Sequence, residues 1–147
     1  MKIRRLALPV VAVSSFLAGT LAPVAFTQSE TPPEYVAVAY MKVSPGGEQA
    51  YIEMERDVWK PIHKKLIEKG LQRSWSLYSL LTAGTGDAYN FVTIQTFDSL
   101  DQHFGADYDT VAVEANPSRT LDSIYEQMNE TRDLVSYQLL QRLDHVE

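Results

Sequence analysis

The sequence has 147 residues, of which 45% are hydrophobic and 22% are charged, as expected for one globular domain. It contains no cysteine, which excludes a disulfide scaffold, a thiol nucleophile and thiolate metal ligands. The formal net charge of −6 disfavours nucleic acid and anionic membrane surfaces as partners.

The first residues resemble a bacterial export signal. Three basic side chains precede an uncharged run of apolar and small residues from Leu6 to Phe26. Cleavage after Ala25 gives a signal peptide of residues 1–25, and cleavage near Ala22 or Thr27 is the alternative. Removing this segment takes away three of the 13 basic residues and none of the 19 acidic ones, so the mature charge is −9. We expect a periplasmic or secreted protein with no membrane contact after cleavage.

A second interpretation of the same segment is an uncleaved anchor. The apolar run is nearly long enough to cross a bilayer, which would leave the protein attached to the inner membrane. In either case residues 26–34, with two prolines, form a short linker. The folded domain is then expected over residues 35–147.

The domain opens with a predicted strand, Tyr35–Val43, that is largely apolar on both faces. A strand with one face in water would alternate apolar and polar residues, so both faces of this one need cover. Ser44–Gly47 is a turn with proline and two glycines.

The next element is a long amphipathic helix, predicted over Gly47–Lys69. Its apolar stripe recurs at spacings of three and four, and consists of Tyr51, Met54, Val58, Ile62 and Leu66. Gly70 supplies the left-handed cap that ends the helix. Pro61 lies inside it, and we expect a kink there because proline donates no backbone hydrogen bond and crowds the carbonyl four residues back.

Trp59 and His63 share one direction on this helix, about 100° round from Val58 and Ile62. They are therefore expected at the rim of the buried stripe. A cleft between the helix and a sheet edge would open at that rim, and the kink at Pro61 would widen it.

The remaining elements follow with shorter signals. We predict a strand over residues 71–82, a hairpin loop over 83–87 and a strand over 88–97. A short helix capped by Ser99 follows, and then an irregular or weakly helical segment over 105–115. The last two elements are a helix starting at Asn116 and Pro117 and a strand over 133–143.

The resulting order, strand, helix, strand, strand, helix, strand, predicts an α+β domain of the ferredoxin-like βαββαβ type. Such a domain is an antiparallel sheet with helices on one face. Because the first three strands are apolar on both faces, we expect a second copy to pack sheet against sheet, which makes a homodimer.

The chain resembles a group of families, the dimeric α+β barrel proteins, which include antibiotic-biosynthesis monooxygenase-like and NIPSNAP-like domains. The resemblance spans Tyr35 to Val146 and rests on the element order, the helix sequence VWKPIHKKLIEKG and the strand sequence RSWSLYSLL. It implies a dimeric barrel. Because the group includes cofactor-free oxygenases, haem-dependent enzymes and proteins with no known activity, it transfers no catalytic residue.

His63 is the best candidate for chemistry, because imidazole titrates near neutrality and can act as a base. Its structural alternative is packing at the helix rim. Trp59, Tyr40, Trp75 and Tyr78 are candidates for the wall of a ligand pocket, or else fill the core or the dimer interface.

Three further polar residues carry weaker signals. Arg73, on the face of Trp75, is a candidate to hold a carboxylate or to pair with a neighbouring acid. His103 and His145 are isolated and expected at the surface.

No metal or cofactor is predicted. Glu55 and His63 are two helical turns apart, too far along the axis to share one ion. No serine lies in a glycine-flanked nucleophile motif, and Gly84 and Gly86 lack the lysine and helix of a phosphate loop.

Two functional hypotheses remain. The first is an exported homodimer that binds a small apolar or aromatic ligand. The second is a cofactor-free, monooxygenase-like enzyme in which His63 acts as the base, with Tyr40 or Tyr78 as a candidate partner. They differ in whether His63 and the aromatic residues line one pocket.

Overall fold

The computed structural model describes residues 34–84 and 86–146. The predicted export segment, with its alternative of a membrane anchor, and residues 26–33 of the predicted linker lie outside these residues. Within the described ranges, no helix is both long and apolar enough to cross a membrane.

Four strands form one antiparallel sheet in the order β2-β3-β1-β4. They are β1 (Tyr35–Lys42), β2 (Ser74–Ser79), β3 (Phe91–Phe97) and β4 (Asp133–Gln141). The central strand β1 pairs with β3 on one side and with β4 on the other. This is the sheet order of the ferredoxin-like fold, so the fold class predicted from the sequence is confirmed.

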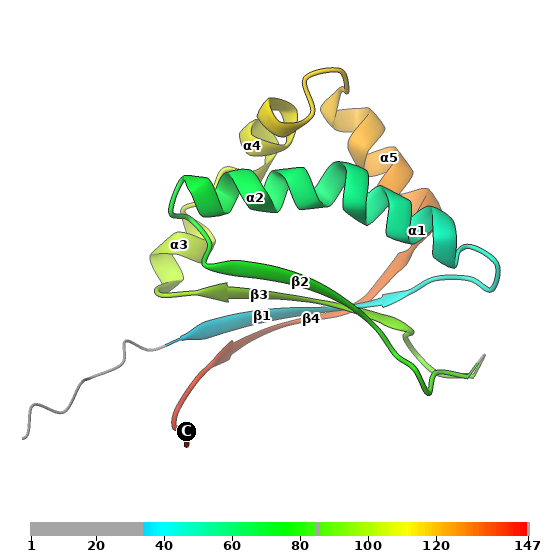
Figure 1. Ribbon diagram of the computed structural model, residues 1–147, viewed down its shortest axis with the longest axis horizontal. Coiled ribbons are helices and arrows are strands. Elements are labelled where there is room, and N and C mark those ends of the chain that lie inside the picture. Colours follow the sequence, from blue (N-terminus) through cyan, green and yellow to red (C-terminus); the bar gives the residue numbers. More distant parts are fainter. Residues whose placement is uncertain (1–33, 85, 147) are drawn as a thin grey trace, which may run out of the picture. The chain divides into compact units, whose positions relative to one another are not determined.

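The helices cover one face of this sheet (Figure 1). One continuous helical segment crosses it and consists of α1 (Glu48–Met54), a π-helical turn η1 (Glu55–Trp59) and α2 (Lys60–Glu68). Between β3 and β4 the chain forms α3 (Leu100–Phe104), α4 (Tyr108–Ala115) and α5 (Leu121–Thr131).

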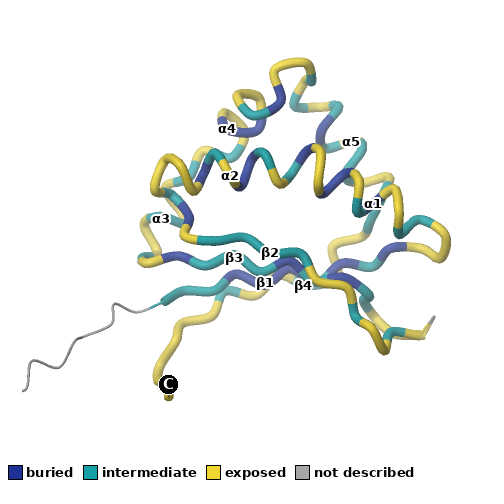
Figure 2. Tube along the Cα trace, viewed as in Figure 1, coloured by how far each residue is buried: buried dark blue, intermediate teal, exposed yellow. Residues whose placement is uncertain are grey.

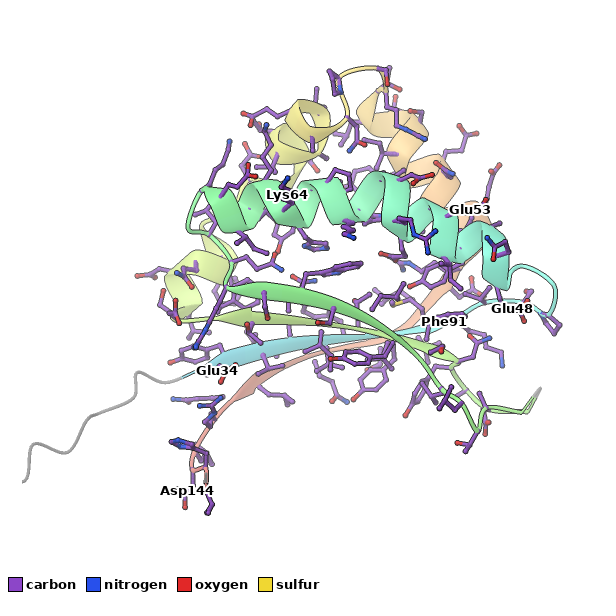
Figure 3. The ribbon with its side chains drawn as sticks, in the orientation of Figure 1. Glu34, Glu48, Glu53, Lys64, Phe91 and Asp144 are labelled. Atoms are coloured by element: carbon purple, nitrogen blue, oxygen red, sulfur yellow. The ribbon has the colours of Figure 1, made fainter. Side chains whose placement is uncertain are left out.

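The core lies between the first helical segment and the sheet. The five stripe residues predicted from the sequence are each at most 1% exposed. They pack with Ala39, Met41 and Phe91 of the sheet, and Figures 2 and 3 show the buried backbone and the packed side chains in this layer. The charged residues Glu53 and Lys64 are exposed.

The π-helical turn lies where the sequence predicts an interruption. Pro61 has no N–H to give to the carbonyl of Asp57, four residues back, and its ring crowds that carbonyl. The segment adapts by widening for one turn, in which the Lys60 N–H bonds to the Glu55 carbonyl five residues back. The effect of Pro61 is therefore a local change of helical type.

Of the two alternatives predicted for residues 105–115, irregular or weakly helical, the helical one holds for residues 108–115, whereas the predicted start of the next helix was wrong. Residues 108–115 form a regular helix, because Asp107 caps it by accepting a hydrogen bond from the Thr110 N–H. The next helix does not begin at Asn116 and Pro117. Asn116 ends α4, and Thr120 caps α5 through the Ser123 N–H. Asp107 and Thr120 are of the residue types that cap helices, but the sequence alone did not show which of the possible capping residues would begin a helix.

The strands are shorter than predicted, and β4 is irregular. Its pairing with β1 shifts register between Tyr40 and Met41, so Tyr40 faces Ser136 while Met41 faces Leu134. Such a bulge leaves one residue of β4 without a partner and changes which side chains face the helices. Leu134 thereby joins the helix-covered side of the sheet.

The other face of the sheet carries an apolar surface without helices. Residues that alternate with the core-facing ones lie on it, namely Val36, Val38, Tyr40, Tyr78, Val92, Ile94 and Leu140. Tyr78 is 51% exposed. We call this set the outer sheet face.

The end of α2 offers a test of the fold. Gly70 has a φ of +69°, and its N–H and that of Leu71 bond back to the carbonyls of Ile67 and Leu66. We expect Gly70→Ala to lower the free energy of unfolding by about 1 kcal/mol, because a Cβ is disfavoured in the left-handed region. Urea denaturation of the mature protein measures this. Gly86→Ala is the control and should change stability by less than about 0.5 kcal/mol; equal effects of both variants would contradict the role of Gly70.

Candidate functional site

A cavity of about 630 Å³ lies between the helices and the sheet. Its floor is formed by β1, β2 and β3, its inner wall by the first helical segment, and its outer wall by α4, the end of α5 and the start of β4. The exposed residues Asn129, Asp133, Leu134 and Tyr137 belong to the lining. The cavity therefore opens to solvent on the β4 side.

The inner wall presents Glu55, Trp59 and His63, spaced four residues apart. In a regular α-helix residues four apart differ by about 40° in direction, so Glu55 and His63 would differ by about 80°. The wider π-helical turn advances less per residue, which reduces this drift. The interruption at Pro61 thus helps to bring all three side chains to one cavity.

His63 is held in one orientation. Its Nδ1 lies 3.0 Å from Oε1 of Gln72, whose own amide nitrogen donates to the Ser74 carbonyl at 2.6 Å. This chain makes Oε1 the acceptor and places the imidazole proton on Nδ1. The ring also stacks on Trp75, with centroids 5.1 Å apart and planes 14° apart.

The imidazole is only 4% exposed. Burial lowers the pKa of His63 to about 4, against a smaller raising effect of the Gln72 hydrogen bond. The ring is therefore neutral at pH 7, and its Nε2 is an acceptor to which no described residue donates a hydrogen bond. A neutral imidazole with a free nitrogen at a cavity can accept a proton or a hydrogen bond from a ligand.

Two indole groups add unpaired donors. The Nε1–H groups of Trp59 and Trp75 are buried and have no hydrogen-bond partner among the described residues. Both tryptophans line the cavity. An unpaired buried donor costs about 1–3 kcal/mol, so these two indole groups carry an energetic penalty within the cavity wall.

Glu55 is an acid in the same wall and is only 3% exposed. Burial raises its pKa to about 7, against the lowering effects of the Tyr51 hydroxyl and the positive charge of Arg132. The Tyr51 hydroxyl is buried without a hydrogen bond of good geometry, and burial together with Glu55 raises its own pKa. Glu55 therefore changes its charge near neutral pH.

Arg132 lies at the outer wall, where α5 ends and β4 begins. Its Nε is buried without a partner. Its guanidinium group forms no ion pair within the described residues, although Glu55 is close enough for its pKa to be lowered by this charge. The cavity thus contains one positive charge without a bonded counter-charge.

The candidates from the sequence are divided between three places. Trp59, His63 and Trp75 line the cavity. Tyr40 and Tyr78 lie on the outer sheet face, where Tyr40 contacts Tyr89 edge to face at 4.7 Å. Arg73 is exposed and pairs with Asp98 at 3.4 Å. The proposed partnership of His63 with Tyr40 or Tyr78 is therefore not available within one chain.

His103 is less isolated than predicted. Its ring stacks on that of Tyr137 with centroids 6.1 Å apart and contacts Phe97 edge to face. Burial lowers the pKa of His103. His103 therefore lies next to Tyr137, which lines the cavity, but His103 itself is not part of the lining.

Sequence reasoning did not assign the polar residues that complete the site. Glu55 was considered only as a metal ligand, although it is an acid between the core residues Met54 and Val58, on the side of Trp59. Arg132 gave no such signal, because the turn between α5 and β4 alone brings it to the cavity. Among the described residues, no group of three or more histidines and carboxylates could hold a metal ion.

Several solved structures share the general fold. A dimeric protein of unknown function with a ferredoxin-like fold from Bacteroides fragilis is 13% identical, with a TM-score of 0.47, and the match covers 76% of this chain and 95% of that one. A NIPSNAP family protein of unknown function from Agrobacterium tumefaciens is 17% identical, with a TM-score of 0.49, covering 77% and 90%.

An EthD family protein from Bacillus halodurans is 11% identical, with a TM-score of 0.46, covering 76% and 99%. No family model and no curated protein matches the chain.

The buried acid can be tested through stability. Because the pKa of Glu55 is about 7 in the folded protein and 4.5 as its ordinary value, its ionisation opposes folding as pH rises from about 4.5 to above 7. We expect Glu55→Gln to raise the free energy of unfolding by up to about 3 kcal/mol at pH 8 and to change it little at pH 4.

Urea denaturation at both pH values measures this. Glu53→Gln, an exposed site on the same helical segment, is the control. A gain of equal size at pH 4 and pH 8 would show that the ionisation of Glu55 is not its source.

Proposed function

We propose that this protein is an exported, homodimeric binding protein for a small, planar, aromatic ligand that carries hydrogen-bonding oxygen atoms. One observation carries the proposal: Trp59, His63 and Trp75 line a single cavity with aromatic rings, together with the polar side chains of Glu55, Gln95 and Arg132. Aromatic walls favour a flat ligand, and the polar side chains favour one with polar atoms.

The size of the cavity supports this class of ligand. About 630 Å³ is within the range of about 300–1,000 Å³ that is usual for small-molecule sites. The sequence suggested an apolar pocket, whereas the lining also contains Glu55, Thr93, Gln95 and Arg132. We therefore narrow the hypothesis from a small apolar or aromatic ligand to an aromatic one with polar substituents.

A second candidate is a cofactor-free enzyme in which His63 is the base. The observation that favours it is the tautomer of the imidazole, because Gln72 holds Nδ1–H and leaves Nε2 unprotonated on a residue that lines the cavity. Nε2 would take a proton from an acidic O–H or C–H group, leaving an imidazolium ion and a ligand anion. In a monooxygenase-like reaction that anion would then be oxidised by dioxygen.

The homodimer is proposed from the outer sheet face. Seven mainly apolar residues lie there, and none of the described helices covers them; Tyr78 and Leu140 are about half exposed, and apolar surface of this kind marks an interface. A second copy packed sheet to sheet would bury it by a two-fold contact. The export proposal depends only on the sequence of residues 1–25, and an uncleaved inner-membrane anchor remains its alternative.

The pocket can be tested with the native ligand. Native mass spectrometry of the mature protein purified from its host is expected to show a small molecule bound to each chain. Trp75→Leu should then weaken the binding of the identified molecule by at least about tenfold, since one well-buried aromatic contact provides about 1–3 kcal/mol. Tyr78→Leu, on the same strand but on the outer sheet face, should leave affinity unchanged; equal losses would place the ligand elsewhere.

His63 distinguishes binding from catalysis. We expect His63→Gln to keep most of the affinity, because an amide can still hydrogen-bond in the cavity, and to abolish any conversion of the ligand, because an amide is not a base. Product formation followed by mass spectrometry, with and without dioxygen, measures this. Conversion at the normal rate by the variant would exclude His63 as the base.

The dimer can be tested by sedimentation at micromolar concentration. The mature protein is expected to sediment as a dimer, and Ile94→Glu should make it monomeric, because a charge buried between two sheets is strongly unfavourable. Lys64→Gln, on the exposed side of α2, makes the same change in net charge and is the control. A monomeric protein without substitution would mean that the outer sheet face is covered in another way.

A further inference from the structure

The cavity has an unbalanced charge that the proposed function does not yet explain. Arg132 is the positive group in its lining, and neither an ion pair nor a hydrogen bond of its side chain occurs within residues 34–84 and 86–146. Its Nε is also buried away from water. Nearby acids are available, yet none forms an ion pair with it.

We propose that the ligand of this cavity is an aromatic carboxylic acid whose carboxylate binds the Arg132 guanidinium, with its ring in the part of the cavity that Trp59, His63 and Trp75 line. This inference rests on the proposed binding function and adds the charge of the ligand. Arginine is suited to this role because its planar group can give two parallel hydrogen bonds to a carboxylate. Part of that group is already desolvated, which reduces the cost of forming the pair.

The arrangement of the site fits a ligand with one charged end and one flat end. Arg132 lies where α5 ends and β4 begins, among the exposed residues Asn129, Asp133 and Leu134. The two tryptophans and His63 come from the helical segment and β2. A carboxylate at the opening would remain near water, while the ring would occupy the aromatic part of the cavity.

Glu55 sets the charge of the site. Below pH 7 its carboxyl group is mostly protonated and the cavity has a net attraction for an anion. Above pH 7 its ionised form repels a bound carboxylate and weakens the field of Arg132. Binding of an aromatic acid should therefore decrease as pH rises through about 7.

Other titratable groups around Glu55 do not change this direction. His63 is neutral throughout this range because its pKa is about 4, and the tyrosines are neutral because burial raises their pKa values further above the ordinary value of 10. Tyr51 and Arg132 interact with Glu55, and the other titratable or charged groups of the cavity lining are His63, Tyr108, Asp133 and Tyr137. Asp133 is exposed to solvent, which screens its charge.

The test uses two matched probes, 2-naphthoate and its neutral amide, 2-naphthamide, with the mature dimer. Isothermal titration calorimetry at pH 6 is expected to show that the acid binds at least tenfold more tightly than the amide. At pH 8 this preference should fall at least threefold, although the carboxylate of the probe is ionised at both pH values. Glu55→Gln should remove the dependence on pH.

Variants of the arginine locate the interaction. Arg132→Gln should abolish the preference for the acid and leave the affinity for 2-naphthamide within about twofold, while Arg132→Lys, which keeps the charge, should retain part of the preference. Arg56→Gln is the control, because it makes the same change in net charge at an exposed position of the same protein.

The possible outcomes separate the inference from the proposed function. Equal binding of the two probes, or equal losses for both in Arg132→Gln, overturns the carboxylate site and leaves the aromatic pocket standing. Binding of neither probe overturns both. A preference for the acid that survives Arg132→Gln also overturns the inference, because the selectivity would then come from another part of the site.

Discussion

The structure depends on the burial of one helical stripe against the sheet. Tyr51, Met54, Val58, Ile62 and Leu66 are almost completely buried, and each such side chain contributes about 1.5–3 kcal/mol relative to exposure. With no cysteine in the sequence, no disulfide supports this contact. The stripe fixes the rotation of the helix, and that rotation places Trp59 and His63 beside the core, at the edge where the cavity opens.

Pro61 connects the backbone of this helix to the chemistry of the site. It prevents a regular α-helical hydrogen bond to Asp57, and the chain forms a π-helical turn instead. That turn carries Glu55 and Trp59, two groups of the cavity wall, so an irregularity of the backbone and a cluster of buried polar groups occur at one place. The segment is regularly packed α-helix on both sides of this turn, so the energetic cost of the irregular backbone is confined to the turn.

The site combines polar groups that burial makes reactive or selective. His63 is neutral and oriented by Gln72, Glu55 titrates near neutral pH, and Arg132 has no ion-pair partner within the described residues. None of these groups would be unusual at a protein surface. Their properties come from the low exposure of the cavity wall, where water no longer compensates a charge or an unpaired donor.

The sequence by itself determined the class of fold, the apolar stripe, the interruption at Pro61 and the position of His63 beside Trp59. These follow from local periodicity, which a single chain displays directly. It did not settle the conformation of residues 108–115, because the ends of that helix depend on which of several possible capping residues forms a hydrogen bond. Only the tertiary structure decided which aromatic residues share a space, because strand register sends Trp75 to the cavity and Tyr40 and Tyr78 to the outer sheet face. The tertiary structure also brings Glu55 and Arg132 together, because residues 77 positions apart in the sequence meet only through the packing of distant elements.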